Sequence, residues 1–308
     1  MKILLNNELA IQQLPEAKAT FYFTDGKNVI FAGLTSNLYV RINRLFEQKK
    51  EDEKVKELWD KAEDLIFDLR LSDIDSLVWY KSLIKSFTPY FNDYINLWEN
   101  YTYLAIDWSN APYLSIKENT QSDLLYIGPF RSRFFLSDVF SVLNKYLKLP
   151  LCPENPRICD LKDTDKCIST CTKGDLELLK TLIRKYYLSA NNDLADRLMK
   201  EYEKFHNDLQ FIKAEEVKIE AKLVLKYYRF LNFLNQTKEI NKTLEVDNRV
   251  YFIEDGLLAE VSDKDSIDFR SINRKIPYRD NEMLAVNKNQ LDERWIVFNF
   301  IANDTVEL

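Results

Sequence analysis

The first part of the chain alternates between short apolar runs and stretches with helical spacing. Residues 19–25 and 28–33 are rich in β-branched and aromatic side chains, and Asp25-Gly26 between them is typical of a hairpin turn. Ser36 then precedes apolar residues at intervals of three and four, which predicts a helix that begins near this position. The pattern therefore predicts two antiparallel strands followed by a helix.

A further strand and helix follow along the chain. Apolar residues alternate with polar ones across residues 64–71, which is the pattern of a half-buried strand. Ser72 and Asp75 have the spacing of a capping box before the next helical stretch, and Pro89 ends that stretch. We therefore expect an α+β fold for residues 1–100, in which helices pack on a small mixed β-sheet.

The remainder divides into four segments by the same patterns. Residues 101–150 contain three strand-like runs and a helix, and residues 151–174 are turn-like and contain the cysteines. Residues 175–245 lack proline and glycine and have helical spacing throughout. Residues 246–308 return to strands, with a hairpin and a late strand at 294–301. We expect the best domain boundary just before the cysteine segment.

The helical segment carries two opposed stripes. One is basic, and a stripe of this kind is either a solvated face or a surface that follows phosphates. Arg131 and Arg133 follow Gly128-Pro129 and could extend such a surface. The basic stripe consists of Lys218, Lys222, Lys226 and Arg229. The apolar stripe consists of Ile212, Ile219, Leu223, Tyr227, Phe230 and Leu234.

Composition excludes several classes of enzyme. His206 is the only histidine, so a metal site with two imidazoles is excluded. The 5 glycines are never closer than seven residues, which excludes the glycine-rich phosphate loops and leaves no expectation of a nucleotide cofactor. No apolar run has the roughly 20 residues that a membrane span needs, and the start of the chain does not resemble a signal peptide. We expect a cytoplasmic protein without membrane association.

Net charge and cysteine spacing add two further expectations. The net charge of −6 argues against diffuse binding to nucleic acid but leaves a local basic groove open. All 4 cysteines lie within twenty residues, and clustered thiolates suit either tetrahedral zinc or an iron–sulfur cluster. Free or disulfide-linked thiols are the alternative. The predicted metal ligands are Cys152, Cys159, Cys167 and Cys171.

Five segments together resemble one known family. Each segment is similar to a motif in the N-terminal half of UvrC, the excinuclease family that belongs to the GIY-YIG nuclease superfamily. The motifs are the GIY-YIG hairpin and helix, a helix followed by an asparagine, a short Y-F-G-P-F/Y strand, a C-x7-C-x3-C run, and a helix that contacts a partner helicase. They lie, in this order, at residues 14–46, 72–92, 124–132, 156–171 and 207–221.

The resemblance implies a nuclease site whose chemistry is missing here. The family uses two hairpin tyrosines, a helix arginine, a metal-binding glutamate and an asparagine, and only the asparagine remains. Hydrolysis of a phosphodiester needs a carboxylate to hold Mg²⁺, and phenylalanine and tyrosine cannot replace it. Arg41 lies two residues beyond the expected arginine, about 200° around a helix. The corresponding positions are Phe21, Phe31, Tyr39, Tyr80 and Asn92.

Three functions remain open. The first is a non-catalytic relative of the repair nuclease that binds DNA or an excision-repair protein, so that we expect no nuclease activity. The second is an active metal-dependent, structure-selective endonuclease with relocated residues, which would use Asp73, Asp75, Asn92 and nearby tyrosines; for the two aspartates, helix capping is the alternative. The third is a metal-stapled interaction protein without a nucleic-acid role. The resemblance implies a [4Fe–4S] cluster on the cysteines, with zinc as the alternative.

Overall fold

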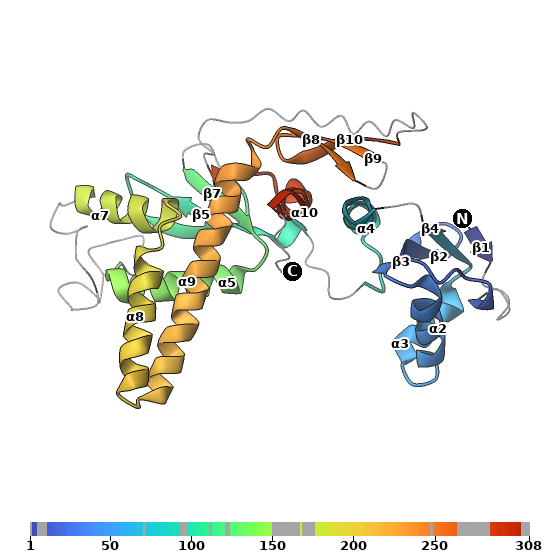
Figure 1. Cartoon of the computed structure of the whole chain (residues 1–308), viewed down its shortest axis with the longest axis horizontal. Coiled ribbons are helices and arrows are strands. Elements are labelled where there is room, and N and C mark those ends of the chain that lie inside the picture. Colours follow the sequence, from blue (N-terminus) through green and yellow to red (C-terminus); the bar gives the residue numbers. More distant parts are fainter. Residues whose placement is uncertain are drawn as a thin grey trace. The chain divides into compact units, whose positions relative to one another are not determined.

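The chain forms two compact units in the computed structural model (Figure 1). Unit 1 comprises Met1–Trp98, Asn241–Asn273 and Asp292–Leu308, whereas unit 2 comprises Glu99–Ile240 and Arg274–Leu291. The C-terminal region of the chain therefore contributes to both units. The structure describes residues 2–4, 11–69, 72–92, 98–110, 113–120, 124–149, 167, 176–246, 249–263 and 284–302.

The first sheet of unit 1 has four strands in the order β1-β4-β2-β3. All of its described pairings are antiparallel, so our expectation of a mixed sheet was wrong. Two helices in succession follow the hairpin, and they return the chain so that β4 runs antiparallel beside β2. The elements are β1 (Lys2–Leu4), β2 (Ala19–Thr24), β3 (Val29–Thr35), α2 (Leu38–Gln48), α3 (Glu53–Lys61) and β4 (Asp64–Asp68).

Local chemistry accounts for the predicted turn and helix start. The Asp25 carboxylate accepts hydrogen bonds from the backbone amides of Lys27 (3.0 Å) and Asn28 (2.7 Å), which lower its pKa. Gly26 adopts a φ of 83°, which glycine allows without steric cost. Asn37 is the N-cap of α2, where its side chain accepts from the Val40 amide at 3.0 Å. The predicted hairpin and helix are confirmed.

Helices cover both faces of this sheet (Figure 1). On one face, α2 and α3 pack over an aromatic core that includes Phe21, Phe23 and Trp59, with ring centroids of Phe23 and Trp59 5.4 Å apart. On the other face lies α4 (Asp73–Phe87), which contacts β2 and β3. Alternate residues of a strand point to opposite faces, so neighbouring residues of β2 belong to different clusters.

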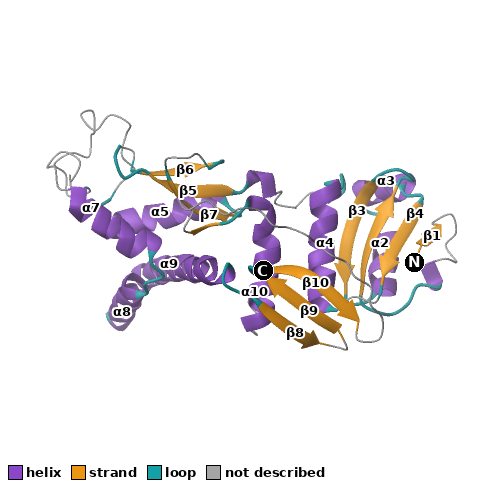
Figure 2. Cartoon of the chain, turned by 90° about the horizontal axis from the view of Figure 1, so that it is seen from above, coloured by secondary structure: helices purple, strands orange, loops and turns teal. Residues whose placement is uncertain are grey.

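Unit 1 also contains a second, three-stranded sheet and a C-terminal helix (Figure 2). Asp255 and Gly256, with φ values of 49° and 72°, form the predicted hairpin turn between its strands. The expected late strand at 294–301 is wrong, because these residues lie in a helix. The elements are β8 (Lys242–Val246), β9 (Arg249–Glu254), β10 (Leu257–Asp263) and α10 (Leu291–Ala302).

The contacts of α10 explain this difference. A short apolar run does not distinguish a buried helix from a strand by its periodicity, and packing decides between them. Here the Glu293 carboxylate accepts from the Leu258 amide at 3.2 Å, and the Arg294 guanidinium donates to the Asp255 carbonyl. Ile296 and Val297 are buried beside them. These contacts hold the helix against the β9–β10 hairpin.

Unit 2 is built on a mixed sheet of order β11-β7-β5-β6, in which the pairing of β11 with β7 is parallel. The three strands predicted within 101–150 are confirmed. The predicted helix begins earlier than expected, because Ser132 caps it by accepting from the Phe135 amide at 3.1 Å. The elements are η1 (Trp98–Asn100), β5 (Thr102–Ile106), β6 (Leu114–Lys117), β7 (Leu125–Phe130), α5 (Arg133–Leu147), β11 (Leu284–Ala285) and η4 (Lys288–Gln290).

The helical region of unit 2 is confirmed up to β8, which begins at Lys242. Its helices are α7 (Leu176–Ile183), the π-helical turn Arg184–Leu188, α8 (Asp193–Asn207) and α9 (Phe211–Thr237), and α8 and α9 form a hairpin (Figure 1). The described part of the chain contains no helix that is both long and apolar enough to cross a membrane.

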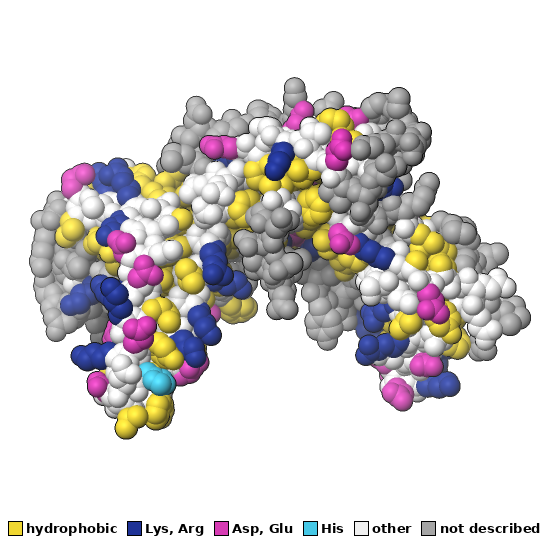
Figure 3. Space-filling model, in the orientation of Figure 1, with side chains coloured by type: hydrophobic (Ala, Val, Ile, Leu, Met, Phe, Trp, Pro, Cys, Tyr) yellow, Lys and Arg dark blue, Asp and Glu magenta, His cyan; other side chains and the backbone are white. Residues whose placement is uncertain are grey.

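The buried stripe of α9 differs from our expectation. Ile212 and Ile219 are 79% and 59% exposed, so they do not belong to the core. Figure 3 shows hydrophobic side chains at the tip of the α8–α9 hairpin. The buried positions recur at alternating intervals of three and four, which is the spacing that two packed helices share. They include Ala214, Val217, Ala221, Val224, Tyr228 and Leu231.

Candidate functional site

Three of the predicted site residues lie in the core of the first sheet. Phe21 is fully buried, and its ring centroid lies 6.1 Å from that of Phe31. Phe31 and Tyr39 are half-buried and pack against the same core cluster. A Cβ added at Gly33 would lie 2.4 Å from the Phe21 Cζ, so the phenylalanine ring fills the space directly over that glycine. Phe21 and Phe31 therefore form part of an apolar core and carry no polar group, and the ring of Tyr39 packs against the same core.

Tyr80 lies on the other face of the sheet, on α4. It packs with Tyr22 against the buried residues Ala32, Leu83 and Ile84. The burial raises the pKa of the Tyr80 phenol, so the hydroxyl is neutral at physiological pH. The predicted cleft residues are therefore divided between two faces, and Tyr22, beside Phe21 in sequence, is the hairpin tyrosine that accompanies Tyr80.

Arg41 lies where its charge acts on this cluster. Its guanidinium partly opposes the effect of burial on the pKa of Tyr80, which places the charge near the phenol. Tyr39, the position at which we expected the arginine, packs into the opposite cluster instead. The charge of Arg41 therefore acts on Tyr80, whereas Tyr39 packs in the other cluster.

Asn92 has a clear role in holding the sheet edge. Its Oδ1 accepts from the Ala32 amide and its Nδ2 donates to the Ala32 carbonyl, both at 2.8 Å. The Phe91 amide also donates to the Ile30 carbonyl at 3.0 Å. Since β3 is the last strand of the sheet, these residues satisfy backbone groups along its open edge. The polar atoms of Asn92 are thus engaged with the fold.

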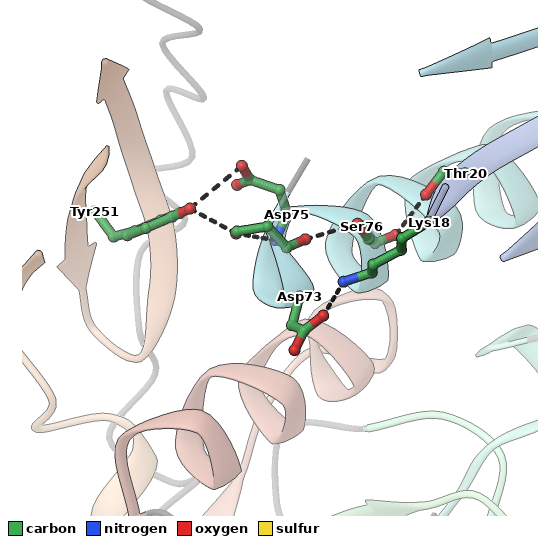
Figure 4. A network of polar contacts seen from close by, with 7 residues as sticks. Lys18, Thr20, Asp73, Asp75, Ser76 and Tyr251 are labelled. Atoms are coloured by element: carbon green, nitrogen blue, oxygen red, sulfur yellow. Dashed lines mark hydrogen bonds and ion pairs between the residues drawn. The ribbon is translucent and has the colours of Figure 1, made fainter. Parts of the chain in front are cut away.

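The two aspartates at the start of α4 are each held by a cation, and Figure 4 shows the pair that Asp73 forms with Lys18. Asp73 pairs with Lys18, and the buried Asp75 pairs with Arg249 of β9. The Tyr251 hydroxyl donates to the Ser72 Oγ at 2.5 Å and lies 3.4 Å from the Asp75 carboxylate.

This network combines the predicted cap with a long-range contact. The Ser72 Oγ accepts from the Asp75 amide at 3.4 Å, as expected for helix capping. Burial raises the pKa of Asp75, whereas Arg249 and Tyr251 oppose that shift. Sequence analysis missed Arg249 and Tyr251, because they lie more than 170 residues from Asp75 and no local pattern marks them.

The predicted nucleic-acid residues lie in unit 2, where the start of α5 packs against α9. The Lys226 Nζ lies 5.4 Å from the Phe135 ring centroid, and the rings of Phe130 and Phe230 are 4.8 Å apart. These contacts bring the segment of Arg133 beside the middle of α9.

The predicted cations differ in exposure and pairing. Arg133, Lys222, Lys226 and Arg229 are exposed, whereas Arg131 is half-buried. Lys218 is half-buried and forms an ion pair with Glu215 at 3.2 Å. The structure therefore joins Arg133 to the later part of the basic stripe only.

The predicted metal ligands fall mostly outside the described residues. Cys152, Cys159 and Cys171 lie outside them, and Cys167 is half-buried. Among the residues that the structure describes, no group of three or more His, Cys, Asp or Glu side chains is arranged to hold a metal ion. The cysteine site therefore stays a prediction.

Comparison with known proteins identifies the N-terminal domain. Residues 19–93 match the family described as "UvrC-like GIY-YIG domain". The chain is 28% identical over 211 residues to UvrABC system protein C of Methanococcus maripaludis, which covers 66% of this chain and 40% of the relative. It is 26% identical over 244 residues to the protein of the same name from Fusobacterium nucleatum, covering 71% and 40%. The chain thus spans about two fifths of the length of these relatives.

Part of the chain is also similar to a solved structure. The GIY-YIG N-terminal endonuclease domain of UvrC from Thermotoga maritima, bound to magnesium, is 22% identical, with a TM-score of 0.25. The similarity covers 27% of this chain and 90% of that domain. The family match and the relatives confirm the predicted resemblance, and the chain contains a UvrC-like GIY-YIG domain.

Proposed function

We propose that this chain is a UvrC-like protein that binds DNA through unit 2 and does not cleave DNA with its GIY-YIG domain. One observation carries the proposal. Where the family has its metal-binding glutamate, this chain has Tyr80, and that side chain is half-buried in an apolar cluster with its hydroxyl neutral. A neutral phenol lacks the negative charge with which a carboxylate binds Mg²⁺.

The surroundings of the aspartates weigh against a relocated nuclease site. Asp75 is buried and its carboxylate faces Arg249 and Tyr251, so a metal ion would have to displace an existing cation. Asp73 is exposed but pairs with Lys18. Asn92 has both ends of its amide bound to the backbone of Ala32. All three of these side chains are therefore engaged in contacts that stabilise the fold.

The basic surface of unit 2 supports DNA binding. Figure 3 shows Lys and Arg side chains along α9. Lys222, Lys226 and Arg229 are exposed on this helix, and Arg133 lies across from them at the start of α5. Cations that follow one another on a surface neutralise phosphates and release counterions from DNA. The relatives' printed name, UvrABC system protein C, agrees with a role in the same system.

A nicking assay tests the loss of cleavage. We expect no nicking of duplex or flapped DNA with Mg²⁺ or Mn²⁺. Tyr80→Phe is the matched control, because it removes only the hydroxyl from the cluster around Ala32 and Leu83. Nicking by the wild-type protein that disappears in folded Tyr80→Phe would show that the phenol is catalytic, and would overturn the proposal.

A salt titration tests the DNA-binding surface. The variant Lys226→Gln/Arg229→Gln should reduce the slope of log K against log salt by about 1.4 on a single strand, at about 0.7 for each lost contact. Lys200→Gln/Lys204→Gln is the control, because it removes the same charge from exposed positions of α8. Equal slopes for both double variants would overturn this assignment.

A partner protein is a second candidate ligand, and one observation favours it. Leu209, Phe211 and Ile212 are 73%, 57% and 79% exposed at the tip of the α8–α9 hairpin, within the segment that resembles the family's helicase-binding helix. Exposed apolar clusters of this kind are typical of protein interfaces. We expect the helicase of the same repair system to bind here, and Phe211→Ala/Ile212→Ala to abolish that binding in a pull-down.

A [4Fe–4S] cluster bound by the cysteines is also part of the proposal. Four thiolates at Cys152, Cys159, Cys167 and Cys171 have the number of ligands that a [4Fe–4S] cluster needs. Protein purified without oxygen should be brown and contain iron. Colourless protein with about one zinc would favour the zinc alternative, and protein without either metal would overturn both.

A further inference from the structure

Phe134 is the most exposed large hydrophobic residue among those that the structure describes. It is the second residue of α5 and is 83% exposed. Its neighbour Phe135 is half-buried, and Phe130 before the helix is fully buried. The Phe134 ring therefore contributes little to the core, and its face is open to a base that could stack on it.

Three cations lie in the segments that meet at the start of α5. Arg133 precedes Phe134, and Lys226 lies over the adjacent Phe135 ring. Arg229 precedes Phe230, which packs on Phe130. Within the described part of the chain, none of these three cations forms an ion pair.

Other lysines of the same helices behave differently. Lys145 of α5 pairs with Glu220 at 2.7 Å, and Lys218 of α9 pairs with Glu215 at 3.2 Å. These pairs lie toward the other end of the α5–α9 contact from Phe134. On these two helices, Arg133, Lys226 and Arg229 therefore lie toward the end of the contact at which α5 begins.

The chemistry of this surface selects one class of ligand. An aromatic platform flanked by cations is typical of proteins that bind single-stranded nucleic acid, because each base has a face that can stack and each nucleotide has a phosphate. In a duplex the base faces are covered by their neighbours. Lys222 to Arg229 extend about 10 Å along the helix, a length over which one strand presents more than one phosphate.

We infer that Phe134 stacks on a base of single-stranded DNA whose phosphates contact Arg133, Lys226 and Arg229. This inference rests on the proposed DNA binding and adds to it the form of the ligand and the residue that contacts the bases. The start of α5 adds the partial positive charge of a helix N-terminus at the same place.

Binding of a fluorescently labelled single strand of 12 nucleotides, followed by anisotropy, tests the inference. Phe134→Ala should weaken binding about tenfold, within the range that base stacking contributes. The salt dependence should stay unchanged, because no charge is removed. Phe134→Trp should bind like the wild type. Phe87→Ala is the control, because Phe87 is another exposed aromatic residue, in unit 1.

An abasic strand of the same length distinguishes stacking from other effects. Wild type and Phe134→Ala should bind it equally, because it offers phosphates without bases. A tenfold loss on both strands, or no loss on the normal strand, would overturn the stacking role and leave the proposed DNA binding intact. Failure of the wild-type protein to bind any DNA would overturn the proposed function itself.

Discussion

The polar groups of unit 1 and the cations of unit 2 are used in opposite ways. In unit 1, Asn92 is bonded to the backbone, and Asp75 at the start of α4 is paired with Arg249. On unit 2, the exposed Lys226 and Arg229 have no ion pair within the described residues. Charges in unit 1 therefore stabilise the fold, whereas these charges in unit 2 remain available to a ligand.

This difference has a general consequence for mutations. Removing a charge from the network of unit 1 should lower stability without changing DNA binding. Removing a charge from the surface of unit 2 should weaken DNA binding without changing stability.

The largest effect is expected for Arg249→Ala. It leaves the buried Asp75 carboxylate without its cation, and breaking a pair of this kind costs about 3–5 kcal/mol. Urea denaturation followed by circular dichroism measures the loss. Lys18→Met removes the partner of the exposed Asp73 and should cost less than about 1 kcal/mol. Equal losses for the two variants would contradict the difference between the buried and the exposed pair.

Gly33→Ala should have the next largest effect. Its Cβ would lie 2.4 Å from the Phe21 Cζ, and overpacking of this kind costs about 1–3 kcal/mol. Thermal unfolding should show a lower Tm, and Phe21→Leu in the same chain should restore part of it by making room for the methyl group. If the double variant were no more stable than Gly33→Ala alone, the steric explanation would be wrong.

A smaller effect on stability, with a clear effect on binding, is expected for Lys222→Gln. The side chain is exposed, so the free energy of unfolding should change by less than about 0.5 kcal/mol. The salt slope of single-strand binding should fall by about 0.7. A loss of stability without a change in slope would place Lys222 with the structural charges instead.

The smallest effect at neutral pH is expected for Tyr80→Phe. Burial raises the pKa of this phenol, so the folded state favours the neutral form. The corresponding stability is fully present below the ordinary pKa of about 10 and is lost as pH rises through the higher folded value. Wild type and Tyr80→Phe should therefore have equal stability at pH 7, and the variant should be the more stable above pH 10. Equal stability at both pH values would show that the phenol is not desolvated.

The sequence by itself determined those elements that depend on residues close together in the chain. The turn at Asp25-Gly26, the cap at Ser72 and the alternation along β4 depend on residues a few positions apart, and the structure confirms all three. Backbone preference and short-range hydrogen bonds act over this distance, so a pattern in the sequence contains the information.

Tertiary structure decided which partner each element meets. The apolar run of α10 could form a strand or a helix, and contacts with the β9–β10 hairpin select the helix. Ile219 fits a helical stripe, but packing against α8 leaves it exposed. Arg249 reaches Asp75 across 174 residues, and Lys226 reaches Phe135 from another helix. Such contacts depend on how whole elements pack, and the spacing of residues within one element does not specify them.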